Sequence, residues 1–141
     1  MRAVITFLVK TACVLIALDF FTTSILGLFF PEQAINIYRI LYGVNLPARQ
    51  DVFLLFKPWA TFGIFAGIIA LFPVFNLKKY RAILWALIVF LGVRLLTRLF
   101  WQPSFQDDWI LSQPRNLFHI GIILIALIIL ILGIKYLEDK R

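Results

Sequence analysis

Residues 117–134, LFHIGIILIALIILILGI, form an almost unbroken apolar stretch that is informative about the fold. The only ionisable side chain within this stretch is His119. A helix rises about 1.5 Å per residue, so one bilayer crossing needs about 20 apolar residues. Residues 117–134 are therefore predicted to cross a membrane as a helix.

Three further apolar stretches precede this one, at about 3–30, 52–75 and 82–101. The connection between the second and third stretches is very short, and short connections make neighbouring helices antiparallel. The sequence thus predicts an all-α integral membrane protein, built as an antiparallel four-helix bundle with a single domain over residues 1–141.

The composition excludes several other classes of protein. The chain is 62% hydrophobic and 15% charged, whereas soluble domains are about 45–50% apolar and about 25% charged. Four spans leave no room for a separate soluble domain, and the single Cys13 cannot build a disulfide scaffold within this chain. The first stretch is too long for a signal peptide, and Phe29-Phe30-Pro31 is a poor cleavage site, so we expect this span to be retained.

The basic residues predict how the chain is oriented. One side of the membrane receives most of them: Arg2, Lys10, Lys78, Lys79, Arg81, Lys135, Lys140 and Arg141. On the other side, basic residues are offset by acidic ones: Arg39, Arg49 and Arg115 against Glu32, Asp51, Asp107 and Asp108. Basic residues flanking spans favour the cytoplasm, so both termini are predicted to be cytoplasmic. The net charge of +7 then reflects orientation, and no nucleic-acid partner is predicted.

The two connections on the outer side are the longer ones. Within residues 31–50 the apolar side chains have the spacing of a short helix lying in the headgroup layer, ended by residues 43–47. The second outer connection, residues 102–116, is predicted to be an ordered loop with an acidic tip. The adjacent Asp107 and Asp108 in that loop are interpreted as solvated carboxylates, because no third metal ligand accompanies them.

Charged side chains inside the spans are the strongest candidates for a site. A charge near the bilayer centre costs about 2.5–3.5 kcal/mol on insertion scales and usually faces protein or a watery cavity. Asp19 lies inside the first span, while Arg94 and Arg98 lie one turn apart in the third. We predict that Asp19 pairs with Arg94, with Arg98 above them. Such a pair either fixes helix register or handles a ligand or proton.

Two more polar side chains lie near the outer ends of spans, Lys57 in the second and His119 in the fourth. With nearby hydroxyl groups they are predicted to ring a pocket that faces outward; these hydroxyls belong to Thr22, Thr23, Ser24 and Thr61. Alternatively, Lys57 extends to the headgroups and His119 is a hydrogen-bonded anchor. A single His has no second ligand for a metal or haem, so no metal or haem site is predicted, and the sequence identifies no cofactor.

Small residues in the second span form a G-x-x-x-G pattern at Gly63 and Gly67. Such a face permits close helix approach, either within the bundle or between two copies. Glycines in the other spans are expected to act similarly: Gly27, Gly92, Gly121 and Gly133. No phosphate loop, zinc-protease motif, C-x-x-C or nucleophile elbow is present, so no catalytic residue is assigned.

The chain resembles the DoxX-like group of small four-helix bacterial membrane proteins. The resemblance rests on residues 24–32 (SILGLFFPE), on the glycine-bearing stretch 62–72 and on Arg94 late in the third span. It implies a location in the bacterial inner membrane and an association with quinone oxidation. No catalytic residue of that group can be matched to this sequence.

The sequence thus predicts a polar cluster in the outer half of the bundle, made of Asp19, Lys57, Arg94, Arg98 and His119. Its excess of Lys and Arg favours a small anionic or amphipathic ligand, or a partner subunit in a membrane complex. One alternative is a quinone-binding oxidoreductase subunit in which Asp19 or His119 carries the proton. Others are a small transporter or channel working as a homo-oligomer, and a structural subunit that uses residues 121–133 as its contact face.

Overall fold

Four long helices make up most of the chain in a computed structural model, which describes residues 2–42, 48–100 and 113–138. They are α1 (Arg2–Phe29), α3 (Gln50–Phe75), α4 (Arg81–Phe100) and α5 (Gln113–Glu138). Each contains a stretch that is long and apolar enough to cross a membrane: Ala3–Phe29, Gln50–Phe75, Arg81–Phe100 and Pro114–Leu137. The prediction of an all-α protein with four helices long and apolar enough to span a membrane is confirmed, with ends displaced by a few residues.

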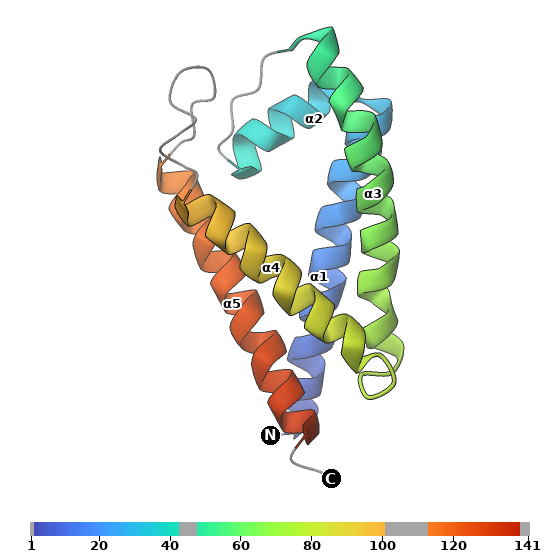
Figure 1. The fold of residues 1–141 in the computed structure, drawn as a ribbon, viewed down its shortest axis with the longest axis vertical. Coiled ribbons are helices and arrows are strands. Elements are labelled where there is room, and N and C mark those ends of the chain that lie inside the picture. Colours follow the sequence, from blue (N-terminus) through green and yellow to red (C-terminus); the bar gives the residue numbers. More distant parts are fainter. Residues whose placement is uncertain (1, 43–47, 101–112, 139–141) are drawn as a thin grey trace.

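The four helices are arranged as two pairs that spread apart toward one end of the molecule (Figure 1). α1 packs most extensively on α3, while α4 packs on α5. At what we call the narrow end, the first turn of α1 and the last turn of α5 lie near the turn that joins α3 to α4 (Figure 1). At the opposite, wide end, the chain after α1 crosses above the opening between the two pairs.

That crossing segment is a short helix, α2 (Pro31–Ile37), followed by a π-helical turn, η1 (Tyr38–Tyr42). Pro31 occupies the first turn of α2, where a missing N–H group costs nothing. The predicted short helix is therefore present. The predicted helix end at 43–47, the acidic loop within 101–112 and the basic residues among 139–141 lie outside the described residues.

The segment is held on both sides of the opening. Ala34 and Ile35 are buried against Phe56 of α3, and the ring of Tyr38 stacks on Phe56 with centroids 5.5 Å apart. On the other side, the guanidinium of Arg115 donates a hydrogen bond to the carbonyl of Arg39 at 2.6 Å. α2 and η1 thus connect α3 to α5 across the wide end.

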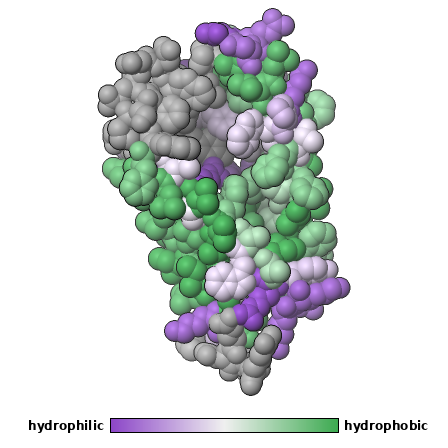
Figure 2. Space-filling model, in the orientation of Figure 1, coloured by the Kyte–Doolittle hydropathy of each residue, from purple (hydrophilic) through white to green (hydrophobic). Residues whose placement is uncertain are grey.

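The main apolar core lies between the four long helices and includes the fully buried side chains of Val9, Cys13, Leu84 and Leu130. Many Leu, Ile and Phe side chains instead point outward. Figure 2 shows them as a broad hydrophobic belt between hydrophilic side chains at the two ends. This surface matches the hydrocarbon region of a bilayer, with polar groups at the two interfaces.

Glycines allow α1 to approach its neighbours closely. A Cβ atom on Gly63 or Gly67 of α3 would meet Ser24 or Phe21 of α1, and one on Gly133 of α5 would meet Val9. The G-x-x-x-G pattern therefore packs α3 against α1 within the chain. In contrast, Cβ atoms on Gly92 and Gly121 would meet nothing within 4 Å, so these two glycines do not pack helices together within the described chain.

Candidate functional site

The site centres on an ion pair between α1 and α4. The Nη1 atom of Arg94 lies 3.3 Å from the Oδ2 atom of Asp19, and the two side chains are 25% and 34% exposed. The pair predicted from the sequence is thus present. It bridges two helices whose backbones make little contact elsewhere, so it spans the opening between the helix pairs.

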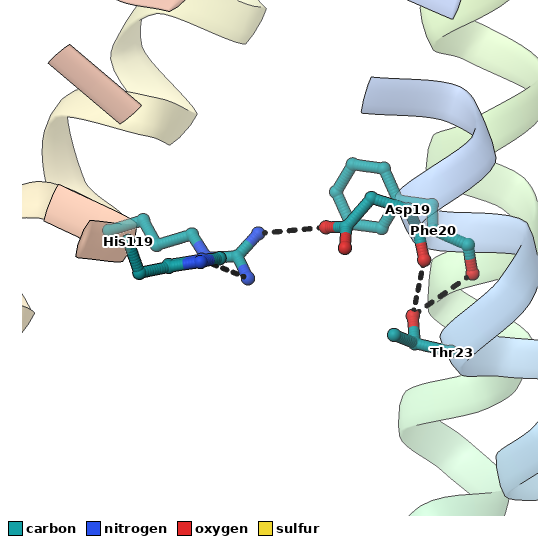
Figure 3. A network of polar contacts seen from close by, with 5 residues as sticks. Asp19, Phe20, Thr23 and His119 are labelled. Carbon is teal, nitrogen blue, oxygen red and sulfur yellow. Dashed lines mark hydrogen bonds and ion pairs between the residues drawn. The ribbon is translucent and has the colours of Figure 1, made fainter. Parts of the chain in front are cut away.

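His119 of α5 completes a row of three side chains from three helices (Figure 3). Its Nε2 atom lies 3.3 Å from the Nη2 atom of Arg94. Since a guanidinium has only donors, this contact is a hydrogen bond when the imidazole is neutral and carries its proton on Nδ1. Arg94 is thereby held between a carboxylate and an imidazole, which fixes the direction of its side chain.

A second polar contact lies one helical turn away along α4. The Nη1 atom of Arg98 donates a 2.7 Å hydrogen bond to Oδ1 of Asn116, whose side chain has no exposed surface. The pairs Arg94–His119 and Arg98–Asn116 form two rungs between α4 and α5, because residues three or four apart share a helix face. Asn116 was not predicted as a site residue, although its spacing from His119 is a signal that the sequence carries.

The hydroxyl groups predicted to ring the site divide between two locations. Thr23 donates to the carbonyl of Asp19 at 2.7 Å and contacts that of Phe20 at 3.2 Å, as Figure 3 shows. Thr23 and the buried Ser24 both line the cavity. Thr22 and Thr61 are exposed and do not line it.

The fold does not place Lys57 beside the other charged residues of the predicted cluster. It is exposed, it does not line the cavity, and its carbonyl accepts a hydrogen bond from Thr61 at 3.0 Å. Its position toward the wide end of α3 is consistent with a side chain that extends to the headgroups. Four of the five predicted residues therefore belong to one cluster: Asp19, Arg94, Arg98 and His119.

A cavity of about 610 Å3 adjoins this cluster. Its volume falls within the range of about 300–1,000 Å3 typical of small-molecule sites. The polar lining comes from charged and hydroxyl groups of α1, η1 and α4: Asp19, Thr23, Ser24, Tyr38, Arg94, Thr97 and Arg98. The rest is mainly apolar and aromatic: Phe20, Val52, Leu55, Phe56, Trp59, Ala60, Phe62, Gly63, Phe90 and Val93.

The apolar part of the cavity reaches the outer surface of the helices. Trp59 is 70% exposed and Phe62 is 53% exposed, and both line the cavity from α3. Val93 lies opposite them on α4 and is 55% exposed. In Figure 2 hydrophilic atoms are visible in a hollow above the hydrophobic belt. The cavity thus combines an apolar rim at the level of the spans with charged groups inside.

Tyr38 of η1 is a further site residue. From the spacing of apolar residues, it was expected only to lie on the short helix within residues 31–50. Its phenol is half-buried, and this burial raises the pKa of Tyr38 above its ordinary value. The Asp19 carboxylate raises that pKa further, while Arg94 and a hydrogen bond with the Thr23 side chain lower it. Single π-helical turns frequently occur at functional sites.

The raised pKa of Tyr38 leads to a testable prediction. Above pH 10.0, the ordinary pKa, the unfolded chain loses the Tyr38 proton while the folded chain keeps it. This contribution to stability is therefore fully present below pH 10 and is lost as the pH rises through the folded-state pKa. In an alkaline absorbance titration, we expect Tyr38→Phe to remove a late-titrating phenol and Asp19→Asn to shift that phenol to lower pH. A late component that survives in Tyr38→Phe contradicts the assignment.

The charges of the cavity lining favour an anion. Among the described residues of the lining, Arg94 and Arg98 accompany one carboxylate, Asp19, so this part of the lining carries one more positive than negative charge. Within the described residues no group of three His, Cys, Asp or Glu side chains is arranged to hold a metal ion. The arrangement is suited to binding an anionic head group while an apolar body lies against the aromatic wall.

Comparisons with protein-family models, curated proteins and solved structures found no match to this chain.

Proposed function

We propose that the protein is an inner-membrane ligand-binding protein whose cavity takes up an amphipathic molecule with an anionic head and an apolar tail. The observation that carries this proposal is the cavity itself, in which Arg94 and Arg98 lie beside an aromatic wall that opens at Trp59. A molecule soluble in the bilayer can reach this opening without crossing water.

The proposed orientation is that of four antiparallel spans with both termini in the cytoplasm of a bacterium. Basic residues concentrate in the turn at the narrow end, where Lys78, Lys79 and Arg81 follow one another closely. The first turn of α1 and the last turn of α5 lie at this same end (Figure 1). By the preference of basic residues for the cytoplasmic side, the cavity then lies in the outer half of the membrane.

The physical case for an anionic head rests on the cost of charge at this depth. Arg94 and Arg98 lie on a predicted span, where charges are expensive unless they meet partners or water. Carboxylate and phosphate oxygens accept strong charge-assisted hydrogen bonds from guanidinium groups. Arg94 contacts Asp19 and His119 at 3.3 Å, which is long for a hydrogen bond. The guanidinium can therefore form shorter hydrogen bonds to the oxygen atoms of a bound anionic head group.

Quenching of Trp59 fluorescence tests the proposal in nanodiscs of phosphatidylcholine. Brominated palmitate is the probe, since bromine atoms quench a tryptophan that they contact. We expect saturable quenching in the wild-type protein and its loss in Trp59→Phe. The matched control is Trp85→Phe, because Trp85 is also exposed on a span but does not line the cavity. Quenching that rises without saturation, or that is equal in the two variants, overturns the proposal.

Competition identifies the head group. Palmitate and hexadecyl phosphate are expected to relieve the quenching, while hexadecanol, which has the same tail and no charge, does not. Stronger relief by palmitate than by hexadecyl phosphate indicates a carboxylate ligand, and the reverse order indicates a phosphate ester. Relief by hexadecanol equal to that by palmitate overturns the anionic head.

The resemblance to the DoxX-like group supports a bacterial membrane location and connects the cavity to quinones as a second candidate ligand. A quinone also has a tail, and the planar rings of Phe20, Phe56 and Phe90 line the cavity. Its head is uncharged, however, so it makes no use of the positive charge excess. Displacement of brominated palmitate by decylubiquinone at lower concentration than by palmitate would favour the quinone over the acid.

A further inference from the structure

A second cavity, of about 270 Å3, lies at the narrow end, away from the ligand cavity. Three parts of the chain meet around it: the beginning of α1, the end of α3 with its following turn, and the end of α5. Its lining consists of Thr6, Lys10, Phe75, Asn76, Leu77, Lys78, Tyr136 and Leu137. We call it the basal pocket.

The basal pocket combines two ammonium groups with polar and apolar surfaces. Lys10 and Lys78 supply the positive charge, and none of the described residues that line the pocket is acidic. Neither lysine forms an ion pair with any residue that the structure describes. The side chains of Thr6 and Tyr136 add hydroxyl groups, which can donate to oxygen acceptors. The pocket therefore offers a positive, hydrogen-bonding environment beside apolar side chains.

The two lysines lie at different depths. Lys78 is exposed in the turn that joins α3 to α4. Lys10 is half-buried within the span Ala3–Phe29, roughly 10 Å beyond Ala3 at about 1.5 Å per residue. The pocket thus extends from the surface turn toward the apolar region. A charged Lys10 at that depth is stabilised by an anion or by water.

We infer that the basal pocket binds the head group of an anionic phospholipid, with its phosphate between Lys10 and Lys78. Basic pockets between membrane helices recognise such head groups by charge and hydrogen bonding. Phe75, Leu77 and Leu137 line the same pocket and provide an apolar surface for the start of the acyl chains. A free anion has no use for that apolar surface, which is why the lipid is the favoured occupant.

The experiment measures retention of dioleoylphosphatidylglycerol by native mass spectrometry, with dioleoylphosphatidylcholine as the zwitterionic reference. Wild-type protein is expected to retain the anionic lipid in preference to the zwitterionic one. The double variant Lys10→Gln/Lys78→Gln is expected to bind the anionic lipid about tenfold more weakly. Inorganic phosphate at millimolar concentration is expected to leave the lipid bound.

A matched double variant separates this pocket from the basic surface as a whole. Lys79→Gln/Lys135→Gln removes the same charge at the same end, yet neither residue lines the pocket; the Lys79 ammonium lies 5.3 Å from the Tyr80 ring centroid instead. This variant is expected to retain the lipid as the wild type does. Equal loss in both double variants, unchanged binding in both, or displacement of the lipid by inorganic phosphate overturns the inference.

Saturable quenching of Trp59 by brominated palmitate provides the folding control for Lys10→Gln/Lys78→Gln. No described residue lines both cavities, so the quenching is expected to persist when lipid retention is lost. The quenching assay tests the proposed function in the wild-type protein, and lipid retention tests the basal pocket. Failure of one proposal is therefore distinguishable from failure of the other.

Discussion

Replacing Arg94 by glutamine is expected to weaken the binding of brominated palmitate about 10- to 100-fold, while replacing Asp19 by asparagine strengthens it. A hydrogen bond to a charged group contributes about 1.5–3 kcal/mol, and about 1.4 kcal/mol corresponds to a tenfold change in affinity. Arg94 donates to Asp19 across 3.3 Å, so the Asp19 carboxylate competes with the ligand for the same guanidinium. Removing its charge raises the net positive charge of the cavity.

The opposite signs of these two effects separate a binding role from a structural one. Both variants break the same ion pair. Asp19→Asn keeps the size of the side chain, whereas Arg94→Gln removes the charge and shortens the side chain. An ion pair that only fixes the register of α1 against α4 predicts lower thermal stability for both variants and no gain in affinity for either. Titrations of Trp59 quenching, with thermal unfolding of the same samples, measure both quantities. Unchanged affinity in Arg94→Gln contradicts the assignment of the site.

Replacing Gly133 by leucine is expected to destabilise the bundle by about 1–3 kcal/mol, the usual cost of overpacking a well-packed core. A Cβ atom at this position already meets the side chain of Val9. Val9 is fully buried, and its branched side chain has few rotamers to adopt. α1 and α5 must therefore move apart to accept the larger residue.

The matched control for this substitution lies on the same helix. Gly121→Leu introduces the same side chain into α5, where a Cβ atom meets nothing within 4 Å, so we expect little change in stability. Unfolding of the two variants in mixed detergent and denaturant gives the comparison. Equal loss of stability in both would show that helix propensity or lipid contact matters here, and not the approach of α5 to Val9.

The elements of the fold that follow from hydropathy could be predicted from the sequence. Each of the four helices contains a predominantly apolar segment of about bilayer length, and this property is independent of what packs against it. The helix at Pro31–Ile37 was indicated by the spacing of apolar residues after Pro31. Depth could be read from the position along a span: at about 1.5 Å per residue, Asp19 lies roughly 16 Å and Arg94 roughly 10 Å from the outer end. A long Arg side chain can bridge that difference, so the two side chains were predicted to pair.

The rotation of each helix about its axis could not be read from the sequence. Lys57 and Trp59 are near neighbours on α3, yet only Trp59 lines the cavity. Asn116 precedes the most apolar stretch and looks like part of a helix start, but it is fully buried against Arg98. Nearly every position on these spans is apolar, so hydropathy gives no face a preference for the interior.

Hydropathy along the chain was sufficient to predict four helices apolar enough to span a membrane, their boundaries within a few residues and the positions of the charges along them. Which charges meet, where the cavity lies and that Tyr38 reaches it from η1 depend on how the helices pack together. The reason is that crossing a membrane depends on local apolar content, whereas the packing of spans depends on shape. Close contacts such as Gly133 on Val9 set helix rotation and spacing, and these in turn leave the space beside Arg94 open.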